Sequence, residues 1–265
     1  MKIKYRVWFP AFWMAVFLLS SCTCQAPATD NSKVFFQAST INALLAGVYD
    51  GDLTFAELER HGDFGLGTVN ALDGEMIGLD GKFYQIKTDG KAYLIHDSVK
   101  TPFAETVFFR PDTVFRTDRA LENLDSLENF LKTLLPSKNI FYAFRIEGSF
   151  PYLKTRSVPR QRKPYPPLAE VVAHQSVFTF RDVKGTLVGF WCPGFVKGIN
   201  VPGFHFHFIT ADRKAGGHVL DCRLSKATVK MALLSVFQMA LPRTQAFYHV
   251  SLSKSRQTEL NKVEK

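Results

Sequence analysis

Three histidines lie close enough in the sequence to bind one divalent cation. The segment 204–208 alternates phenylalanine and histidine with the period of a β-strand, so the imidazoles of His205 and His207 share one face. The polar run 210–217 has the composition of a hairpin turn, and pairing across it places His218 opposite His207. Three imidazoles on two rigid strands are suitable ligands for a divalent metal that keeps a position open for water or substrate. The spacing therefore predicts a metal site at these three histidines.

The segments that lead to the histidines are predicted to be strands. Residues 139–147 and 150–156 are rich in aromatic and aliphatic side chains on either side of Gly148, which is typical of two paired strands. Segments 177–180 and 185–191 predict two further strands that run into the histidine hairpin. We therefore expect these strands to carry the histidine hairpin of the C-terminal half.

The first half predicts short helices among strands. Apolar residues recur at helical spacing over 40–48, and Thr54 with Glu57 forms a capping-box pattern. Asp-Gly pairs at 73 and 80 predict a strand-turn-strand unit over 70–85, and leucines predict an amphipathic helix over 119–135. The predicted fold class is α/β in the mixed sense, a strand-rich α+β fold. We expect two closely packed sheet-containing domains, residues 35–150 and 151–265, with the metal site on a β-hairpin of the C-terminal half.

Two charged side chains outside the hairpin could take part in chemistry. Arg156 stands where a predicted strand meets the proline-rich loop 157–167, and a guanidinium there suits bidentate capture of a carboxylate. Pairing with a nearby acidic residue at the surface is the alternative. Glu75 follows the turn at Asp73, where a carboxylate is usually solvated. The tail 251–265 is weakly amphipathic, which predicts a frayed and solvated end.

The first 34 residues predict export. Residues 1–21 combine three basic residues with an apolar run of about 13 residues, shorter than the roughly 20 that span a bilayer, so they are typical of a signal peptide. The stretch that ends at Cys22 resembles the lipobox of bacterial lipoproteins, which implies a lipid anchor at Cys22 and a tether over 22–34. The predicted location is the cell envelope, at the periplasmic side or the cell surface, and plain secretion is the alternative.

Charge and cysteine content exclude some classes of protein. Removal of the signal peptide lowers the formal net charge from +9 to +6, and the basic residues accompany no nucleic-acid-binding motif. We therefore expect no nucleic-acid partner, and membrane contact only through the lipid anchor. Cys192 and Cys222 lack CxxC spacing, so the sequence indicates no disulfide framework and leaves open whether they pair.

Several blocks of the chain, in order, resemble the α-acetolactate decarboxylases. The blocks cover most of the chain between about residues 36 and 225, and they are 42–51, 61–68, 72–76, 155–160, 197–203, 205–207 and 212–218. The resemblance implies decarboxylation of 2-acetolactate to acetoin and CO2 in a two-domain α/β fold that typically forms a homodimer. It also implies Zn2+ as the cofactor, held by the three histidines.

The resemblance also assigns catalytic residues. It implies that Glu75 is a glutamate near the metal, that Arg156 is the active-site arginine, and that Glu264 is the glutamate which the C-terminal part brings to the site. Glu259 is an alternative to Glu264. In such a site the zinc would stabilise an enediolate, Arg156 would orient the carboxylate, and Glu75 or Glu264 would deliver a proton to carbon.

Two other classes of protein remain as alternatives. A non-catalytic envelope lipoprotein would bind metal at the histidines without turning over a substrate. A cupin-type metal oxygenase or a hydrolase would also use a His-x-His strand, but cupins add a glutamate a few residues further on, and residues 208–213 contain Asp212 and no glutamate.

Overall fold

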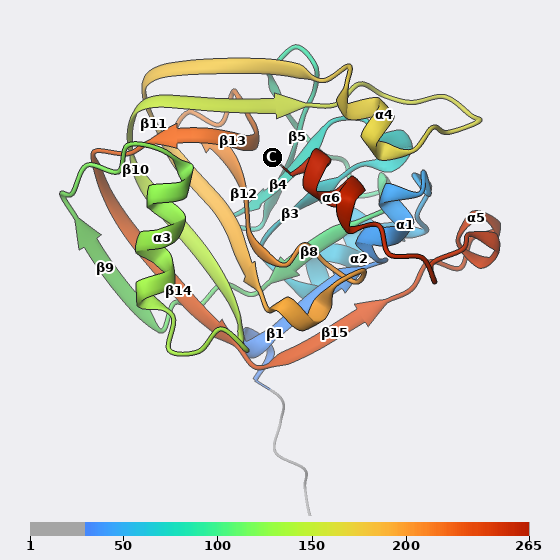
Figure 1. Cartoon of the computed structure of the whole chain (residues 1–265), viewed down its shortest axis with the longest axis horizontal. Helices are drawn as coiled ribbons and strands as arrows, with labels where there is room; N and C mark the ends of the chain where they lie inside the picture. The colour runs from blue at the N-terminus through green and yellow to red at the C-terminus, as the bar shows by residue number, and fades with distance from the viewer. Residues whose placement is uncertain (1–29, 265) are drawn as a thin grey trace, which may run out of the picture.

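Two β-sheets face each other across a shared apolar core (Figure 1). The computed structural model describes residues 30–264, so the predicted signal peptide and Cys22 lie outside the described residues. The first sheet has the strand order β15 (Val236–Ala240), β1 (Val34–Ala38), β8 (Ala104–Val107), β3 (Phe64–Thr68), β4 (Glu75–Leu79), β5 (Lys82–Ile86) and β6 (Ala92–Leu94). The second has the order β11 (Ser176–Cys192), β12 (Gly203–Thr210), β13 (Gly216–Arg223), β10 (Phe141–Ser157), β14 (Lys226–Leu234) and β9 (Thr113–Thr117).

The remaining elements lie at the margins of the sheets. β2 and β7 form a separate two-stranded ladder, and the helices are short except for α3. Their bounds are β2 (Leu53–Thr54), β7 (Lys100–Thr101), α1 (Ile41–Leu45), α2 (Phe55–Leu58), α3 (Leu124–Leu134), α4 (Leu168–Val172), α5 (Gln245–His249), α6 (Gln257–Val263), and the 3-10 turns η1 (Asn31–Lys33), η2 (Glu59–His61), η3 (Asn70–Leu72) and η4 (Gly194–Val196). No helix within residues 30–264 combines the length and the apolar character that crossing a membrane requires.

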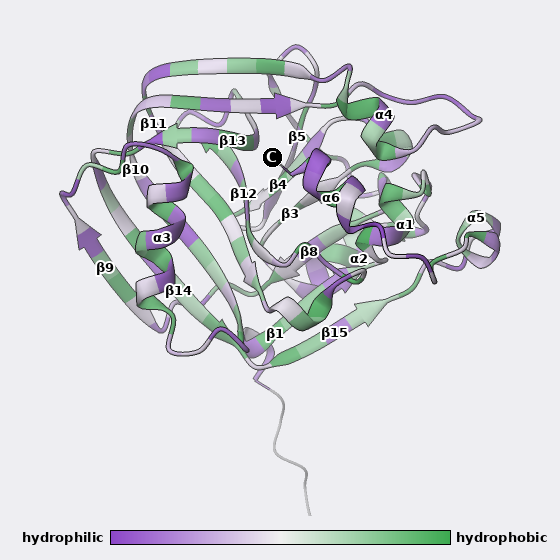
Figure 2. Cartoon of the chain, in the orientation of Figure 1, coloured by the Kyte–Doolittle hydropathy of each residue, from purple (hydrophilic) through white to green (hydrophobic). Residues whose placement is uncertain are grey.

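The second sheet curls on itself. β10 pairs with β13 and β14 and also with β11, so β11, β12, β13 and β10 form a closed set of antiparallel strands. The phenylalanines of β12, which share one strand face as the alternation predicts, pack into the cluster inside this curl together with Leu127 and Leu131 of α3. Figure 2 shows hydrophilic bands on α3, whose other residues cover the curl. The opposite face of β12 is therefore free to meet the first sheet.

The strand-rich mixed fold is confirmed, but two predicted strand breaks are wrong. β10 continues through Gly148, because the glycine is needed there for close approach of three strands: a Cβ at Gly148 would lie 2.6 Å from the Lys226 carbonyl oxygen. β11 likewise runs unbroken from Ser176 to Cys192. Asp182 has a positive φ of 49° and is skipped in the ladder, so the polar stretch between the two predicted strands is an irregularity within one strand.

Both halves of the chain contribute strands to each sheet, and residue 150 itself lies within a strand. That residue lies within β10, and β15 returns from the end of the chain to pair in parallel with β1. β9 belongs to the N-terminal half of the sequence but pairs with β14 in the second sheet. The two sheets are thus assembled from both halves of the sequence, because edge strands are exchanged between them.

Two of the three predicted helix starts are confirmed by their caps. The Thr40 hydroxyl accepts from the Ala43 amide at the start of α1, and Thr54 with Glu57 forms a complete capping box on α2. α3 begins later than its leucine pattern predicts, at Leu124, because Asn123 caps it. These caps satisfy backbone donors that a short helix leaves unpaired.

The prediction of a frayed C-terminal tail is wrong. Residues 257–263 form α6, and Leu260 and Val263 are buried in an apolar cluster with α1 and α4. Only two apolar side chains dock this helix, which is too few for a periodic signal in the sequence. The docking carries the end of α6 to the histidine hairpin (Figure 1).

Candidate active site

The histidine hairpin has the predicted register. β12 and β13 pair with His207 directly opposite His218, and His205 lies two residues before His207 on the same face. One ring nitrogen from each of the three histidines lies within 4.8 Å of the others, and all three side chains are buried. The Nε2 atom of His205 is 3.1 Å from Nδ1 of His218. The structure therefore brings together the three residues that the sequence predicted as ligands.

The surroundings of the histidines keep them neutral and suited to a metal. Burial lowers the pKa of His205 to about 3, and burial also holds the pKa values of His207 and His218 well below the ordinary value. Nδ1 of His207 donates to the backbone carbonyl of Met76 at 2.8 Å, which leaves its Nε2 with a free lone pair. Three neutral imidazoles, one oriented by a carbonyl behind it, fit a divalent cation such as zinc.

Glu75 reaches the histidines from the first sheet. It opens β4 directly after a turn in which Gly74 has a φ of 88°, and its side chain is buried. Its Oε2 lies 3.7 Å from Nε2 of His207, and its Oε1 lies 3.9 Å from the Arg156 guanidinium. Burial raises the pKa of Glu75 to about 7, while the positive charge of Arg156 opposes that shift. The carboxyl group is therefore poised to hold or release a proton near neutral pH.

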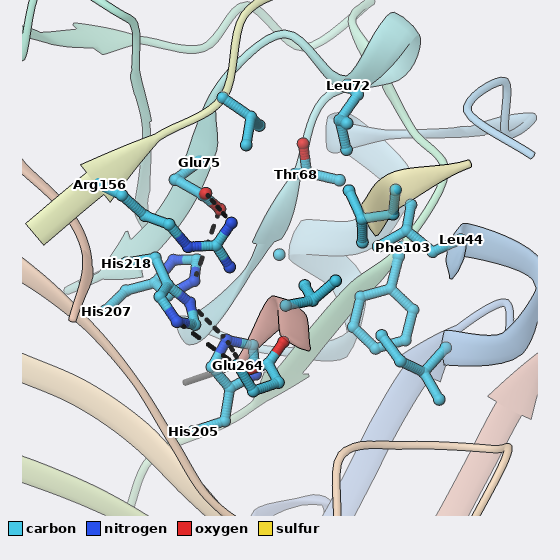
Figure 3. A pocket seen from close by; sticks show the side chains of 15 residues that line it. Leu44, Thr68, Leu72, Glu75, Phe103, Arg156, His205, His207, His218 and Glu264 are labelled. Atoms are coloured by element: carbon cyan, nitrogen blue, oxygen red, sulfur yellow. Dashed lines mark hydrogen bonds and ion pairs between the residues drawn. The ribbon is translucent and has the colours of Figure 1, made fainter. Parts of the chain in front are cut away.

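Arg156 lies near the end of β10 and is 4% exposed, so the alternative of a surface arginine is wrong. It is opposite His218 in the ladder with β13. Gly217 permits this approach, because a Cβ there would lie 2.5 Å from the Arg156 carbonyl oxygen. Figure 3 shows the guanidinium directed between Glu75 and the histidines. A buried cation at this place can hold an anionic substrate group.

Glu264 completes the polar side of the site. It follows α6, and its Oε2 lies 3.8 Å from Nε2 of His205 and 3.8 Å from Nε2 of His218 (Figure 3). Burial raises its pKa to about 7, again against the effect of Arg156. Glu259 instead pairs with Arg256 at 2.7 Å. The structure thus favours Glu264 over Glu259 as the glutamate of the C-terminal part.

The site lines a small, partly open cavity with two unlike walls. The histidines, Glu75, Arg156 and Glu264 form the polar wall, and a group of apolar side chains forms the other. The cavity measures about 40 Å³. A ligand would fit closely against both walls.

Comparison with known proteins decides the family. A profile of the alpha-acetolactate decarboxylases matches residues 35–254. The chain belongs to this family. It is similar to the alpha-acetolactate decarboxylase of Methanosarcina mazei, with 53% identity over 234 residues that cover 88% of this chain and 81% of the relative. The alpha-acetolactate decarboxylase of Bacillus licheniformis is 44% identical over 228 residues, 86% of this chain and 90% of the relative.

A solved structure of the family has the same fold. The crystal structure of alpha-acetolactate decarboxylase from Bacillus subtilis strain 168 superposes with a TM-score of 0.85 at 40% sequence identity, and covers 87% of this chain and 99% of that one. The family match ends at residue 254, so Glu264 lies beyond it. The place of Glu264 in this decarboxylase therefore rests on the contacts of its own side chain with the histidines.

Sequence reasoning missed a buried carboxyl group close to this site. Glu105 on β8 is fully buried between Gln37 of β1 and Leu66 of β3, and neither carboxyl oxygen has a hydrogen-bond partner among the described residues. Burial raises its pKa to about 8; the nearby Asn200 side chain opposes this and the charge of Glu264 adds to it. Cys192 is a further titratable group beside it, and burial together with the charge of Glu105 raises the pKa of its thiol. Nothing in an apolar strand marks one glutamate as buried, so the sequence held no signal for it.

The pKa of Glu105 predicts how stability changes with pH. Because the folded-state pKa of about 8 exceeds the ordinary 4.5, the folded chain holds a proton that the unfolded chain releases, and stability falls as pH rises from about 4.5 to about 8. Glu105→Gln removes this loss. We compare the free energy of unfolding of the variant with that of the unchanged protein, measured in urea at pH 5 and at pH 8.5. The difference should grow in favour of the variant by on the order of a few kcal/mol from the lower to the higher pH. An equal difference at the two pH values would contradict a buried, protonated Glu105.

Proposed function

We propose that this protein converts 2-acetolactate to acetoin and CO2. The observation that carries the proposal is the buried histidine triad flanked by Glu75, Arg156 and Glu264 in a chain of the alpha-acetolactate decarboxylase family. A keto acid needs three things from such a site: a positive group for its carboxylate, an electrophile for its oxygens, and an acid for the carbon that loses CO2. Each has a candidate on the polar wall.

We propose zinc as the metal that His205, His207 and His218 hold. Three neutral imidazoles with a position left open are typical of a catalytic zinc site. When bound, the cation would supply a Lewis acid that stabilises negative charge on the ketone and hydroxyl oxygens of the substrate. The hydrogen bond from His207 to the Met76 carbonyl fixes the ring that presents Nε2 to the cation.

The protein's own side chains would then perform the remaining steps. Arg156 would hold the substrate carboxylate, and its burial strengthens the electrostatic attraction between the two groups. When the bond from this carboxyl group to carbon breaks, CO2 leaves and the electron pair moves toward the neighbouring ketone. Glu75 or Glu264 would return a proton to that carbon, since the pKa of each is raised to about 7. The buried site limits access of water to the reacting atoms.

An assay with racemic 2-acetolactate tests the function. Protein that begins at residue 25 is incubated with the substrate with and without a chelator, and acetoin is measured. Acetoin formation that the chelator abolishes and added zinc restores is the expected result. Bound metal without acetoin would instead favour the metal-binding lipoprotein, and oxygen consumption would favour an oxygenase.

We also propose that the chain is exported and anchored through a lipid on Cys22. The support is the basic, apolar and lipobox-like order of residues 1–22, which lie outside the described residues. In a bacterial host, Cys22→Ser should move the protein from the membrane fraction to the soluble exported fraction. Mass spectrometry of the N-terminal peptide should find lipid on Cys22 of the unchanged protein. An unmodified Cys22 on a mature chain would contradict the anchor.

A homodimer is a further proposal, supported by the family resemblance. Light scattering during size-exclusion chromatography of the exported form should give twice the mass of one chain. A mass equal to one chain over a range of concentrations would exclude it.

A further inference from the structure

The apolar wall of the cavity is built from separate parts of the chain. Each of its side chains belongs to one buried cluster, with exposures between 2% and 6%. α1, η3, the approach to β8, α4 and α6 contribute, through Leu44, Leu72, Phe103, Leu168 and Val263. These segments, together with Val158 after β10, converge on one small cavity and leave its apolar wall little freedom to move aside.

Leu72 is held in this wall by an unusual backbone. Ala71 and Leu72 have φ values of 62° and 51°, a conformation that L side chains rarely adopt. The turn is fixed from both sides, because the Ala71 amide donates to the Tyr49 carbonyl and the Ala71 carbonyl accepts from the Gln161 amide. Such strain persists only where the surrounding structure imposes it, and it is concentrated at functional sites. The same turn leads directly to Glu75. It therefore places Leu72 on the apolar wall and Glu75 on the polar wall.

On the basis of the proposed function, the chemistry of the substrate determines which of its groups contacts this apolar wall. C2 of a 2-alkyl-2-hydroxy-3-oxo acid carries a carboxylate, a hydroxyl, an acyl group and an alkyl group. The three oxygen-bearing groups require the polar wall, where Arg156, the histidines and the glutamates lie. The methyl end of the acyl group is tied to its ketone oxygen and so to the polar wall, whereas the alkyl group carries no oxygen and gains most by burial against hydrocarbon.

We propose that Leu72 and Phe103 form a subsite for the alkyl group on C2 and limit its length. Figure 3 shows both side chains on the side of the cavity away from the histidines, with Thr68 and Leu44 beside them. In a cavity of about 40 Å³, each added methylene group must displace part of this wall. The subsite therefore selects short alkyl groups, and shortening either side chain admits longer ones.

The test compares 2-acetolactate with its 2-ethyl, 2-propyl and 2-butyl analogues. We expect kcat/KM of the unchanged protein to fall as the alkyl group lengthens, by roughly tenfold or more for each methylene beyond the limit. In Leu72→Ala and in Phe103→Leu, the ratio of kcat/KM for the propyl analogue to that for 2-acetolactate should rise at least about tenfold. Two variants from different segments are used because either one could fail to fold.

Phe83→Leu is the matched control. Phe83 is 2% exposed, like Phe103, but it packs in a different cluster with Phe55 and does not line the cavity. It should lose stability and keep the selectivity of the unchanged protein. Ratios that stay within about twofold in active Leu72→Ala and Phe103→Leu would overturn the subsite. That result differs from a failure of the proposed function, in which the unchanged protein would not produce acetoin from 2-acetolactate.

Discussion

His218→Ala is expected to abolish tight metal binding and to lower kcat/KM for 2-acetolactate at least about a thousandfold. The substitution removes one of three buried imidazoles whose ring nitrogens gather within 4.8 Å. His205 and His207 would remain, both on β12, with no ligand from the opposite strand. The measurement is zinc content after dialysis against a weak chelator, together with acetoin formation.

His96→Ala is the control for this loss. His96 is exposed and its Nδ1 hydrogen-bonds to Ser98, so the variant removes an imidazole that does not line the site. It should retain both the zinc and the activity. If His218→Ala retained one zinc per chain and full activity, the triad would not be the metal site.

Glu75→Gln is expected to lower kcat about 10²- to 10⁴-fold while zinc stays bound. The amide keeps the size of the side chain but cannot donate a carboxylic proton to carbon. Glu75 lies 3.7 Å from His207 and 3.9 Å from Arg156, so its proton is held where the substrate carboxylate and the metal centre meet. The measurement is the rate of acetoin formation at saturating substrate, with metal content as a second readout.

Glu264→Gln is the companion variant, because Glu264 contacts the other two histidines. The glutamate whose amide causes the larger fall in kcat is the proton donor. Glu122→Gln, an exposed glutamate that pairs with Arg223, should leave kcat unchanged. Full turnover in Glu75→Gln would remove that residue from proton transfer.

The histidine hairpin could be predicted because its information is local. A period of two decides which side chains share a face, and a short polar turn sets the register, so His207 opposite His218 follows from adjacent residues. The helix caps at Thr40 and Thr54 are local in the same way. Strand ends were less predictable. A glycine such as Gly148 indicates a turn in sequence, but in the fold it allows three strands to approach closely.

The rest of the site depends on contacts between distant segments. The 3.9 Å approach of Glu75 to Arg156 joins the two sheets, and no spacing in the sequence contains it. Only the resemblance to a known family connected these residues before the structure did. Glu264 reaches the histidines through the docking of Leu260 and Val263, which tertiary packing decides. The left-handed backbone at Leu72 is imposed by partners at Tyr49 and Gln161.

The placement of all three imidazoles on β12 and β13 affects the order in which the centre is assembled. A hairpin of neighbouring strands closes a short loop and forms within microseconds, whereas the segments with Glu75, Arg156 and Glu264 must be joined over long stretches of chain. We therefore expect a refolding chain to capture its cation before it gathers the acid and the guanidinium. A cation caught early would hold the two strands in register while the other sheet packs against them.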